Sequence, residues 1–398
     1  MNLQQYKFIV ASGCSYATTL SSLDSKLLDV KLDTTDNLIF VEVGCASQGS
    51  DWAYDSTLYT IETLLKLGVL SENIYCFVEW TQIERITINQ PANSHKLLND
   101  NIAKEKGNKH FYIKGKDNDI IEHLYNSLNI KSLQDVHNIM SIDELFYINP
   151  LHTHPKDISK FNDVDLEFYF NVALEYELHI PMDVRVKKYL DNILNLQRFL
   201  TSNSIEYNFA MMQSQFSGWE LDSNDIPVHK YTINSNKPAI SVNNSKIVIN
   251  SNFKKNLNIT KSADLIKIFP QFESIFNKID LTKWWFYNKG GYRFGGIDEY
   301  ALEEYGLHGF LFTSFDLRLP SEPIIFERFL PSFGYHPHAF IHILLINEMM
   351  FNNKFFKVSN ETITQIKNMV SEDIESKNIT KHNLAISKNE IKKYIELI

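Results

Sequence analysis

Three apolar segments of the chain each lead into residues that could take part in acyl transfer. The first ends in Gly13-Cys14-Ser15-Tyr16, the second leads into the loop 44–52, and the third ends in Trp80-Thr81. A fourth group, His336-Pro337, lies far downstream, just before another apolar segment. A serine hydroxyl, several hydrogen-bond donors and an imidazole together make a nucleophilic site. We therefore expect these groups to meet at one place.

Each group has a defined task in that chemistry. The Ser15 hydroxyl follows a strand directly, where it would be exposed and could attack an acyl carbonyl. Backbone N–H groups of the glycine-containing loop 44–50 and the Thr81 hydroxyl could donate hydrogen bonds to the developing oxyanion. The His336 imidazole could act as the general base. Structural alternatives remain open: Ser15 as an ordinary residue at a strand end, and His336 as a loop residue that caps the following helix.

Strand-like segments alternate with helical segments along the chain, and this alternation predicts a parallel sheet. Short apolar runs predict the strands, and apolar residues at helical spacing predict the helices. The expected strands are 6–12, 37–44, 73–80 and 205–212, and the expected helices are 16–29, 51–68 (closed by Gly68) and 184–202. Ligands of such sheets bind beyond the carboxyl ends of the strands, and the polar groups named above fall at those ends.

The remaining segments are expected to decorate one α/β domain. Residues 1–90 and 181–350 would form that domain, 91–180 a large insertion, and 351–398 a helical C-terminal extension. The insertion carries helical patterns near 119–128 and 131–147, and the segment 215–258 is expected to be irregular, with a hairpin around 238–250. Further helices are expected at 261–279, 297–306 and 339–351.

Composition excludes several classes of protein. The 398 residues are 44% hydrophobic and 22% charged, which is ordinary for a globular protein and excludes wholesale disorder. The net charge of −9 gives no global basic surface, so neither nucleic acid nor a membrane is expected as a partner. The first residues lack the apolar core of a signal peptide, and no window of 18 apolar residues predicts a membrane span.

Cysteines and other reactive residues suggest no second site. The three cysteines, Cys14, Cys45 and Cys76, are too few and too scattered for a disulfide framework or a thiolate zinc site, and we expect them in the core. His152 and His154 alone do not define a metal geometry, so no metal is expected. The aromatic run 284–287 could stack on sugar rings, but it is more typical of a core or an interface.

Taken together, the four groups resemble the blocks of the SGNH (GDSL-like) hydrolases, in the divergent form found in tailed phages. Gly13-Cys14-Ser15-Tyr16 is similar to the first block, and the loop 44–50 to the second. Trp80-Thr81 with Arg85 is similar to the third block of the phage-type relatives, and His336-Pro337 to half of the last. The resemblance covers little more than half of the chain. It implies a three-layer α/β/α fold with a flavodoxin-like parallel sheet.

The resemblance also implies roles for single residues. Ser15 would be the nucleophile, and its own N–H would contribute to the oxyanion hole with Gly49 and Thr81; Gly44 or Ser47 are alternatives to Gly49. His336 would be the base. The sequence departs from the family at two positions that the chemistry uses. Phe333 occupies the place of the acid that orients the histidine, and Thr81 the place of an asparagine. Trp80 and Arg85 would line the site.

Two functions from different classes follow. The first is a serine esterase or deacetylase that removes an O-acyl group from a small molecule or a glycan, without a cofactor. The second is a catalytically degenerate phage structural or assembly protein that keeps the fold and acts through contacts with other viral proteins. Either would be found in the host cytoplasm or associated with the virion. A nucleotide-binding α/β protein is a weaker alternative, because no Gly-x-Gly-x-x-Gly or Walker loop follows a strand.

Overall fold

The structure is a computed structural model, and its described residues fall into two compact units. The first unit takes its residues from 1–18, 36–209 and 272–284, and the second from 19–35, 210–271 and 285–398. Within these ranges the structure describes residues 2–13, 37–44, 49–83, 87–88, 112–115, 117–128, 140–141, 180–229, 241–243, 246–248, 263–289, 292–297, 299–300 and 364. The expected helices 16–29 and 339–351 and nearly all of the C-terminal extension lie outside the described residues.

A five-stranded, mostly parallel sheet forms the centre of the first unit, so the expected α/β fold is confirmed. The strand order is β5-β2-β1-β3-β7, and β1 pairs in parallel with both β2 and β3. Almost every residue of the three central strands is buried, which explains their continuous apolar runs. The bounds are β1 Lys7–Gly13, β2 Leu38–Glu42, β3 Ile74–Trp80, β5 Tyr112–Lys114 and β7 Glu206–Met211.

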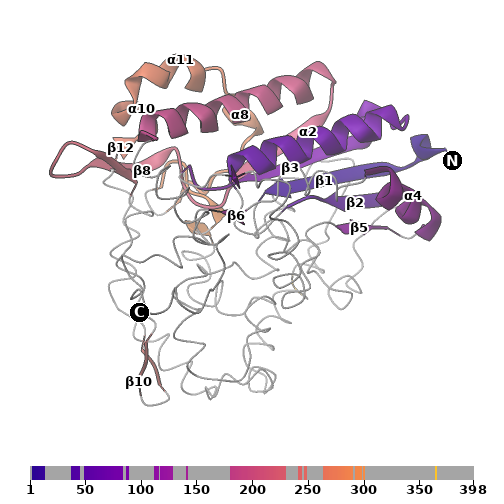
Figure 1. The fold of residues 1–398 in the computed structure, drawn as a ribbon, viewed down its shortest axis with the longest axis horizontal. Helices are drawn as coiled ribbons and strands as arrows, with labels where there is room; N and C mark the ends of the chain where they lie inside the picture. The colour runs from indigo at the N-terminus through magenta and orange to yellow at the C-terminus, as the bar shows by residue number, and fades with distance from the viewer. Residues whose placement is uncertain are drawn as a thin grey trace, which may run out of the picture. The chain divides into compact units, whose positions relative to one another are not determined.

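Two long helices, α2 (Ser50–Lys66) and α8 (Met182–Ser202), lie side by side over one face of this sheet (Figure 1). Both were expected within two residues of these bounds. α2 ends where Gly68 takes a φ of +88°, a conformation that favours glycine and closes the helix. α8 begins directly after Pro181. Proline has no N–H to donate and its ring clashes with the carbonyl four residues before it, so the helix does not extend further toward the N-terminus.

The edge of the sheet beside β2 is formed by a strand from the expected insertion 91–180, where no strand was predicted. β5 pairs antiparallel with β2, and α4 (Asn118–Leu128) follows it, close to the expected helical segment 119–128. The expected helix 131–147 is wrong at Met140–Ser141, which form the short strand β6 paired with β4 (Thr87–Ile88). Two-residue strands give no periodic pattern that a sequence would reveal.

Asp117 fixes the start of α4. Its carboxylate Oδ1 accepts hydrogen bonds from the backbone N–H groups of Asp119 and Ile120, at 3.1 and 3.2 Å. Its other oxygen accepts the hydroxyl proton of Tyr6, the residue just before β1. These donors, the Tyr6 hydroxyl first, lower the pKa of the Asp117 carboxyl, and the same hydrogen bond raises the pKa of Tyr6. The cap therefore ties α4 to the beginning of the central strand.

The second unit contains a small antiparallel sheet, ordered β12-β8-β9, where the segment 215–258 was expected to be irregular. β8 (Ser217–Leu221) and β9 (Pro227–His229) form a hairpin, and β12 (Ala263–Asp264) pairs with β8 on its other side. The Asp222 carboxylate accepts two backbone N–H groups of the hairpin turn, an Asx turn that explains the tight connection. The expected hairpin at 238–250 is confirmed by β10 (Ser241–Asn243) and β11 (Lys246–Val248).

The single helix expected at 261–279 is wrong. That segment begins with β12 and continues as α10 (Leu265–Ile268), a 3₁₀ turn (Pro270–Phe272) and α11 (Glu273–Phe276). Pro270 explains the break, because proline has no N–H to donate and its ring clashes with the carbonyl four residues before it. The spacing of the apolar residues predicts one helix, but Pro270 prevents a continuous helix from forming.

The two end residues of the aromatic run 284–287 are buried in the cores of the units and do not form an exposed platform for stacking. Trp284, in the first unit, is buried with its ring 5.3 Å from that of Phe209. Tyr287, in the second unit, is buried with its ring 5.8 Å from that of Tyr300. The core interpretation therefore holds for these two residues.

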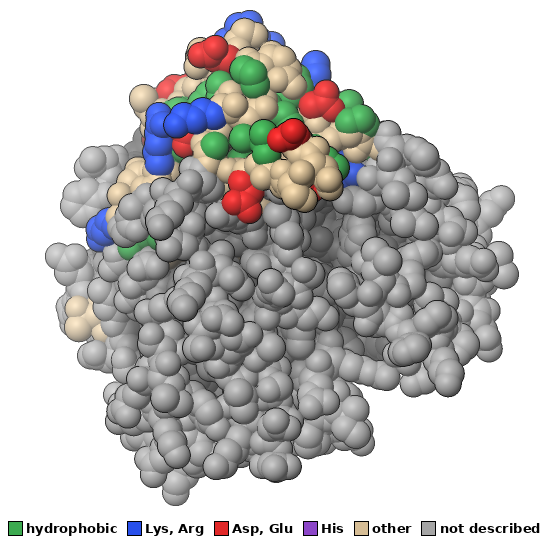
Figure 2. All heavy atoms as spheres, turned by 90° about the vertical axis from the view of Figure 1, so that its left-hand side faces the viewer, with side chains coloured by type: hydrophobic (Ala, Val, Ile, Leu, Met, Phe, Trp, Pro, Cys, Tyr) green, Lys and Arg blue, Asp and Glu red, His purple; other side chains and the backbone are tan. Residues whose placement is uncertain are grey.

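The described surface carries both signs of charge. On the face in Figure 2, Lys and Arg side chains are interspersed with Asp and Glu side chains and with hydrophobic ones. Among the described residues, no helix combines the length and the apolar character needed to cross a bilayer.

We predict that the Asp117 cap makes a pH-dependent contribution to stability. Because the folded-state pKa of Asp117 is lowered, its stabilisation is present above the ordinary aspartate pKa and is lost as the pH falls through the folded-state value. Asp117→Asn, which can still cap the helix, should therefore lower the free energy of urea unfolding at pH 7 and lower it less near pH 2. Tyr6→Phe should shrink this difference between the two pH values. A deficit in Asp117→Asn that does not change with pH would contradict the prediction.

Candidate functional site

The carboxyl ends of β1, β2 and β3 meet at one edge of the sheet, as the parallel pairing requires. Gly13, the last residue of β1, lies opposite Glu79 of β3, and the N–H of Val43 just after β2 donates to the carbonyl of Ala11, at 2.8 Å. Gly13 has a φ of 149°, which residues with a side chain rarely adopt. The chain therefore leaves the central strand through a conformation that favours glycine, two residues before Ser15.

Gly49 is the N-cap of α2. It is buried and lies at the same edge of the sheet. Its expected role as an oxyanion donor would draw on the backbone freedom of glycine. Its φ of −82° and ψ of 178° are extended values that any residue adopts, so this freedom is not needed there. What the position does offer is the start of a helix whose N-cap makes no side-chain hydrogen bond. The first N–H groups of a helix have no partner inside it and can bind an anion.

Trp52 attaches the first turn of α2 to the end of β2. Its indole Nε1 donates a hydrogen bond of 2.9 Å to the carbonyl of Val43, and the side chain is almost completely buried. Val43 is followed by Gly44, the alternative donor, which is also buried. The hydrogen bond therefore links β2 and α2 directly across the loop that was expected to supply an oxyanion donor.

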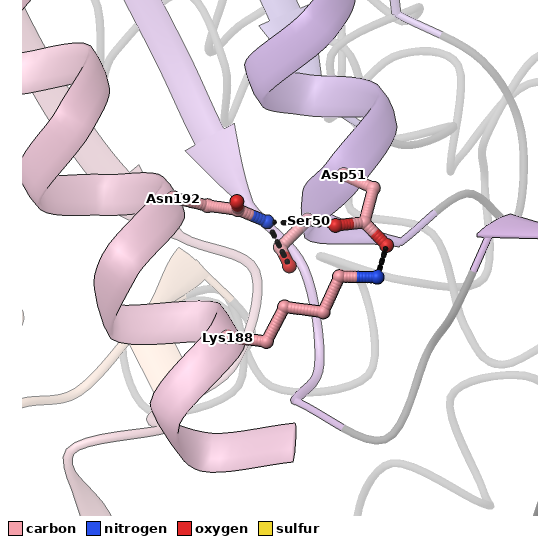
Figure 3. Close-up of polar contacts among 4 residues, drawn as sticks. All are labelled: Ser50, Asp51, Lys188 and Asn192. Atoms are coloured by element: carbon pink, nitrogen blue, oxygen red, sulfur yellow. Dashed lines mark hydrogen bonds and ion pairs between the residues drawn. The ribbon is translucent and has the colours of Figure 1, made fainter. Parts of the chain in front are cut away.

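α8 also contacts the same turn (Figure 3). The Asn192 side-chain Nδ2 donates to Ser50 Oγ at 3.2 Å and to Asp51 Oδ1 at 2.9 Å. Lys188 Nζ lies 2.8 Å from Asp51 Oδ2 and forms an ion pair with it. Ser50 and Asp51 are the first two residues of α2, so α8 binds the helix at its N-terminus. Sequence reasoning did not identify this cluster.

The end of β3 carries the expected third block. Trp80 is fully buried and packs edge-on against Tyr189 of α8 and Phe209 of β7. Thr81 follows it and is also fully buried; its hydroxyl donates a long hydrogen bond, 3.4 Å, to the carbonyl of Gln82. The Thr81 hydroxyl thus has one weak partner among the described residues.

Two buried carboxylates at this edge were also missed. Glu42 and Glu79 are 4% and 0% exposed and pair with Ala11 and Gly13 of β1 respectively. Ser12 points to the face of the sheet that α2 covers, because its Oγ meets Ser56 Oγ at 2.9 Å. Side chains alternate along a strand, so both glutamates point to the opposite face. A single acid near the end of an otherwise apolar strand was the signal available in the sequence.

Cysteine chemistry is not available at Cys76. Its side chain is fully buried in β3, and burial raises the pKa of the thiol well above its ordinary value. The expected place of Cys76 in the core is therefore confirmed. Cys14 and Cys45 lie outside the described residues.

The other expected site residues also lie outside the described residues: Ser15, Ser47, Arg85, Phe333 and His336. The distance from Ser15 Oγ to His336, on which the nucleophile and base assignment depends, is therefore a prediction. In the part of the chain that the structure describes, no three His, Cys, Asp or Glu side chains are grouped as metal ligands.

The attachment of α2 to β2 can be tested by Trp52→Phe. This variant keeps most of the buried ring but removes the donor to the Val43 carbonyl, which should lower the free energy of unfolding by about 1–3 kcal/mol. Tyr59→Phe, on the same helix but partly exposed, is the matched control and should change it by less than about 0.5 kcal/mol. Chemical denaturation of both variants measures the difference, and equal stabilities would contradict the role given to Trp52.

The described edge thus brings together Gly13, Gly44, Gly49, Trp80 and Thr81 at the ends of three adjoining strands. Ser50, Asp51, Glu42 and Glu79 join them there. Comparisons with models of protein families, with curated proteins and with solved structures found no match for this chain.

Proposed function

We propose that the protein is a serine hydrolase of the SGNH type that removes an O-acyl group from a small molecule or a glycan. The observation that carries the proposal is the convergence of Gly13, the start of α2 at Gly49, and Thr81 at one sheet edge. Ser15 follows Gly13 by two residues, so its hydroxyl would lie next to backbone and side-chain donors. Such donors stabilise an oxyanion in a site that water does not fill.

The order of the strands supports the finer fold assignment. In chain order, the four strands β1, β2, β3 and β7 lie as 2-1-3-4, which is the beginning of the flavodoxin-like order. α2 and α8 would make one helical layer, and the expected helix at 16–29 would belong to the layer on the opposite face. The complete three-layer SGNH-like domain is therefore part of the proposal.

In the proposed mechanism, Ser15 Oγ attacks the carbonyl carbon of the ester while His336 takes the hydroxyl proton. The carbonyl oxygen becomes an oxyanion and accepts hydrogen bonds from Ser15 N–H, from Gly49 N–H and from the Thr81 hydroxyl, which turns away from its weak partner, the Gln82 carbonyl. Collapse of this intermediate breaks the C–O bond, and His336 returns the proton to the leaving alcohol. Water then hydrolyses the acyl-enzyme by the same steps. No cofactor takes part.

The acid of the site would come from elsewhere in the chain, because Phe333 stands where the family carries it. We expect the second imidazole nitrogen of His336 to meet a backbone carbonyl, a water or a carboxylate. Glu42 and Glu79 are the buried carboxylates that the structure describes at this edge, and either could serve. An active site requires one of these partners for the second imidazole nitrogen of His336. A nitrogen that meets only apolar groups would indicate a site that has lost its function.

The alternative function is that of a phage structural or assembly protein with a degenerate site. The sequence favours it at two positions, because Phe333 stands in place of the acid and Thr81 offers a hydroxyl donor in place of the asparagine amide. Such a protein would act through contacts with viral proteins, in the host cytoplasm or in the virion. Its signature would be adjacent Ser15 and His336 without turnover.

We predict that a fluorophosphonate probe labels the purified protein at Ser15, as detected by peptide mass spectrometry. Ser15→Ala should abolish both the labelling and the hydrolysis of an aryl acetate, while circular dichroism shows an unchanged fold. His336→Ala should also abolish labelling, because a serine hydroxyl without a base is a poor nucleophile. Thr81→Ala should leave labelling detectable but slow it by about 10- to 1000-fold.

Unchanged turnover in Ser15→Ala would exclude the proposed hydrolase. Absence of both labelling and turnover in the folded parent protein would favour the structural alternative.

A further inference from the structure

Ser50 lies at the N-terminus of α2 with its hydroxyl oxygen already bound. The residue is 6% exposed, and Ser50 Oγ accepts the hydrogen bond from Asn192 Nδ2 at 3.2 Å. The second hydrogen of that amide goes to Asp51 Oδ1, at 2.9 Å. One amide group therefore orients two consecutive residues of the first helical turn (Figure 3).

Within the described part of the chain, the hydroxyl proton of Ser50 has no acceptor. A serine hydroxyl has one donor and two acceptor positions, and a buried donor normally finds an acceptor. Among the described residues, the only hydrogen bond of the Ser50 hydroxyl is the one that it accepts from Asn192. Because Asn192 occupies one lone pair with a donor, the Ser50 proton must point away from it. The arrangement therefore holds a buried donor without a described acceptor at the carboxyl edge of the sheet.

The position of Ser50 on α2 places it near the proposed reaction. One helical turn further along, the Ala53 carbonyl accepts a long hydrogen bond from Ser12 Oγ at 3.4 Å. Ser12 is the penultimate residue of β1, so α2 runs back from the edge along the end of this strand. Ser50 precedes Ala53 by three residues and follows Gly49 directly, which brings it to the level at which β1 ends.

We propose that the Ser50 hydroxyl is a further hydrogen-bond donor to the oxyanion, and that Asn192 is its positioning residue. The inference rests on the proposed hydrolase function and gives roles to two residues for which the family resemblance implied none. It assigns the second-block contribution to a side chain as well as to the Gly49 backbone.

Lys188 makes this position suitable for a negative charge. Asp51 follows Ser50, and a free carboxylate there would repel an oxyanion at short range. The Lys188 ammonium offsets that charge through its ion pair with Asp51 Oδ2. The pair lies at the edge of the cluster: the Lys188 side chain is 53% exposed and that of Asp51 15%. With Asp51 paired to Lys188, the first N–H groups of α2 and the Ser50 hydroxyl are the donors that would face an oxyanion at this position.

The test compares Ser50→Ala with Ser56→Ala by steady-state hydrolysis of an aryl acetate. Ser56 is a matched control, since it is a fully buried serine on the same helix whose Oγ is bonded to Ser12 Oγ. Ser50→Ala should lower kcat by about 100-fold with little change in KM, because the oxyanion exists only beyond the ground state. Ser56→Ala should leave kcat within about threefold of the parent. A melting temperature for each variant separates loss of fold from loss of a donor.

A double variant tests whether Asn192 acts through Ser50. Asn192→Leu should lower kcat with little change in KM, and adding it to Ser50→Ala should cause no further loss. If the kcat losses of the two single variants multiply in the double variant, Asn192 does not act through Ser50. If kcat is unchanged in Ser50→Ala, the inference is wrong while the Ser15-dependent function stands. If the parent protein shows no Ser15-dependent turnover, the hydrolase function and the inference both fail. If Asn192→Leu does not fold, the comparison of Ser50→Ala with Ser56→Ala decides alone.

Discussion

The placement of the first turn of α2 at the carboxyl edge of the sheet is the constraint on which the candidate site depends. Two hydrogen-bonding contacts hold that turn: Trp52 donates to the end of β2, and Asn192 donates to Ser50 and Asp51 from α8. The Trp52 bond is buried, where a polar atom without a partner would cost roughly 1–3 kcal/mol, and the Asn192 bonds are partly buried. The turn is therefore held in a narrow range of positions relative to β1 and β3, and a donor on it is held with the same precision.

The central strand imposes a second constraint at the same place. β1 has neighbours on both sides, so its last residue cannot shift along the sheet without breaking two ladders. Gly13 then turns the chain out of the sheet with a φ that favours glycine. Whatever follows Gly13 starts from a fixed point beside the helix N-terminus, and this is why the Gly-x-Ser sequence is informative here. A serine after a mobile turn would not start from such a point.

Much of the first unit could be predicted from the sequence, because its elements are long and have strong local signals. β1, β2, β3, α2 and α8 each come from an apolar run or from a helical pattern that glycine or proline ends. Short or long-range features could not be predicted. β5 has only three residues, and the contact between Asn192 and Ser50 joins positions 142 residues apart. Pro270 was a visible signal against the helix at 261–279, and the acids Glu42 and Glu79 were visible within apolar strands.

The most direct test of the account is a crystal structure of the protein after reaction with an alkyl fluorophosphonate, which forms a stable mimic of the tetrahedral intermediate. We predict phosphorus bonded to Ser15 Oγ and a phosphoryl oxygen within about 3.2 Å of the Gly49 N–H nitrogen and of Ser50 Oγ. His336 should lie within hydrogen-bonding distance of an oxygen on that phosphorus. An adduct on another residue, or a phosphoryl oxygen directed away from the first turn of α2, would contradict the account.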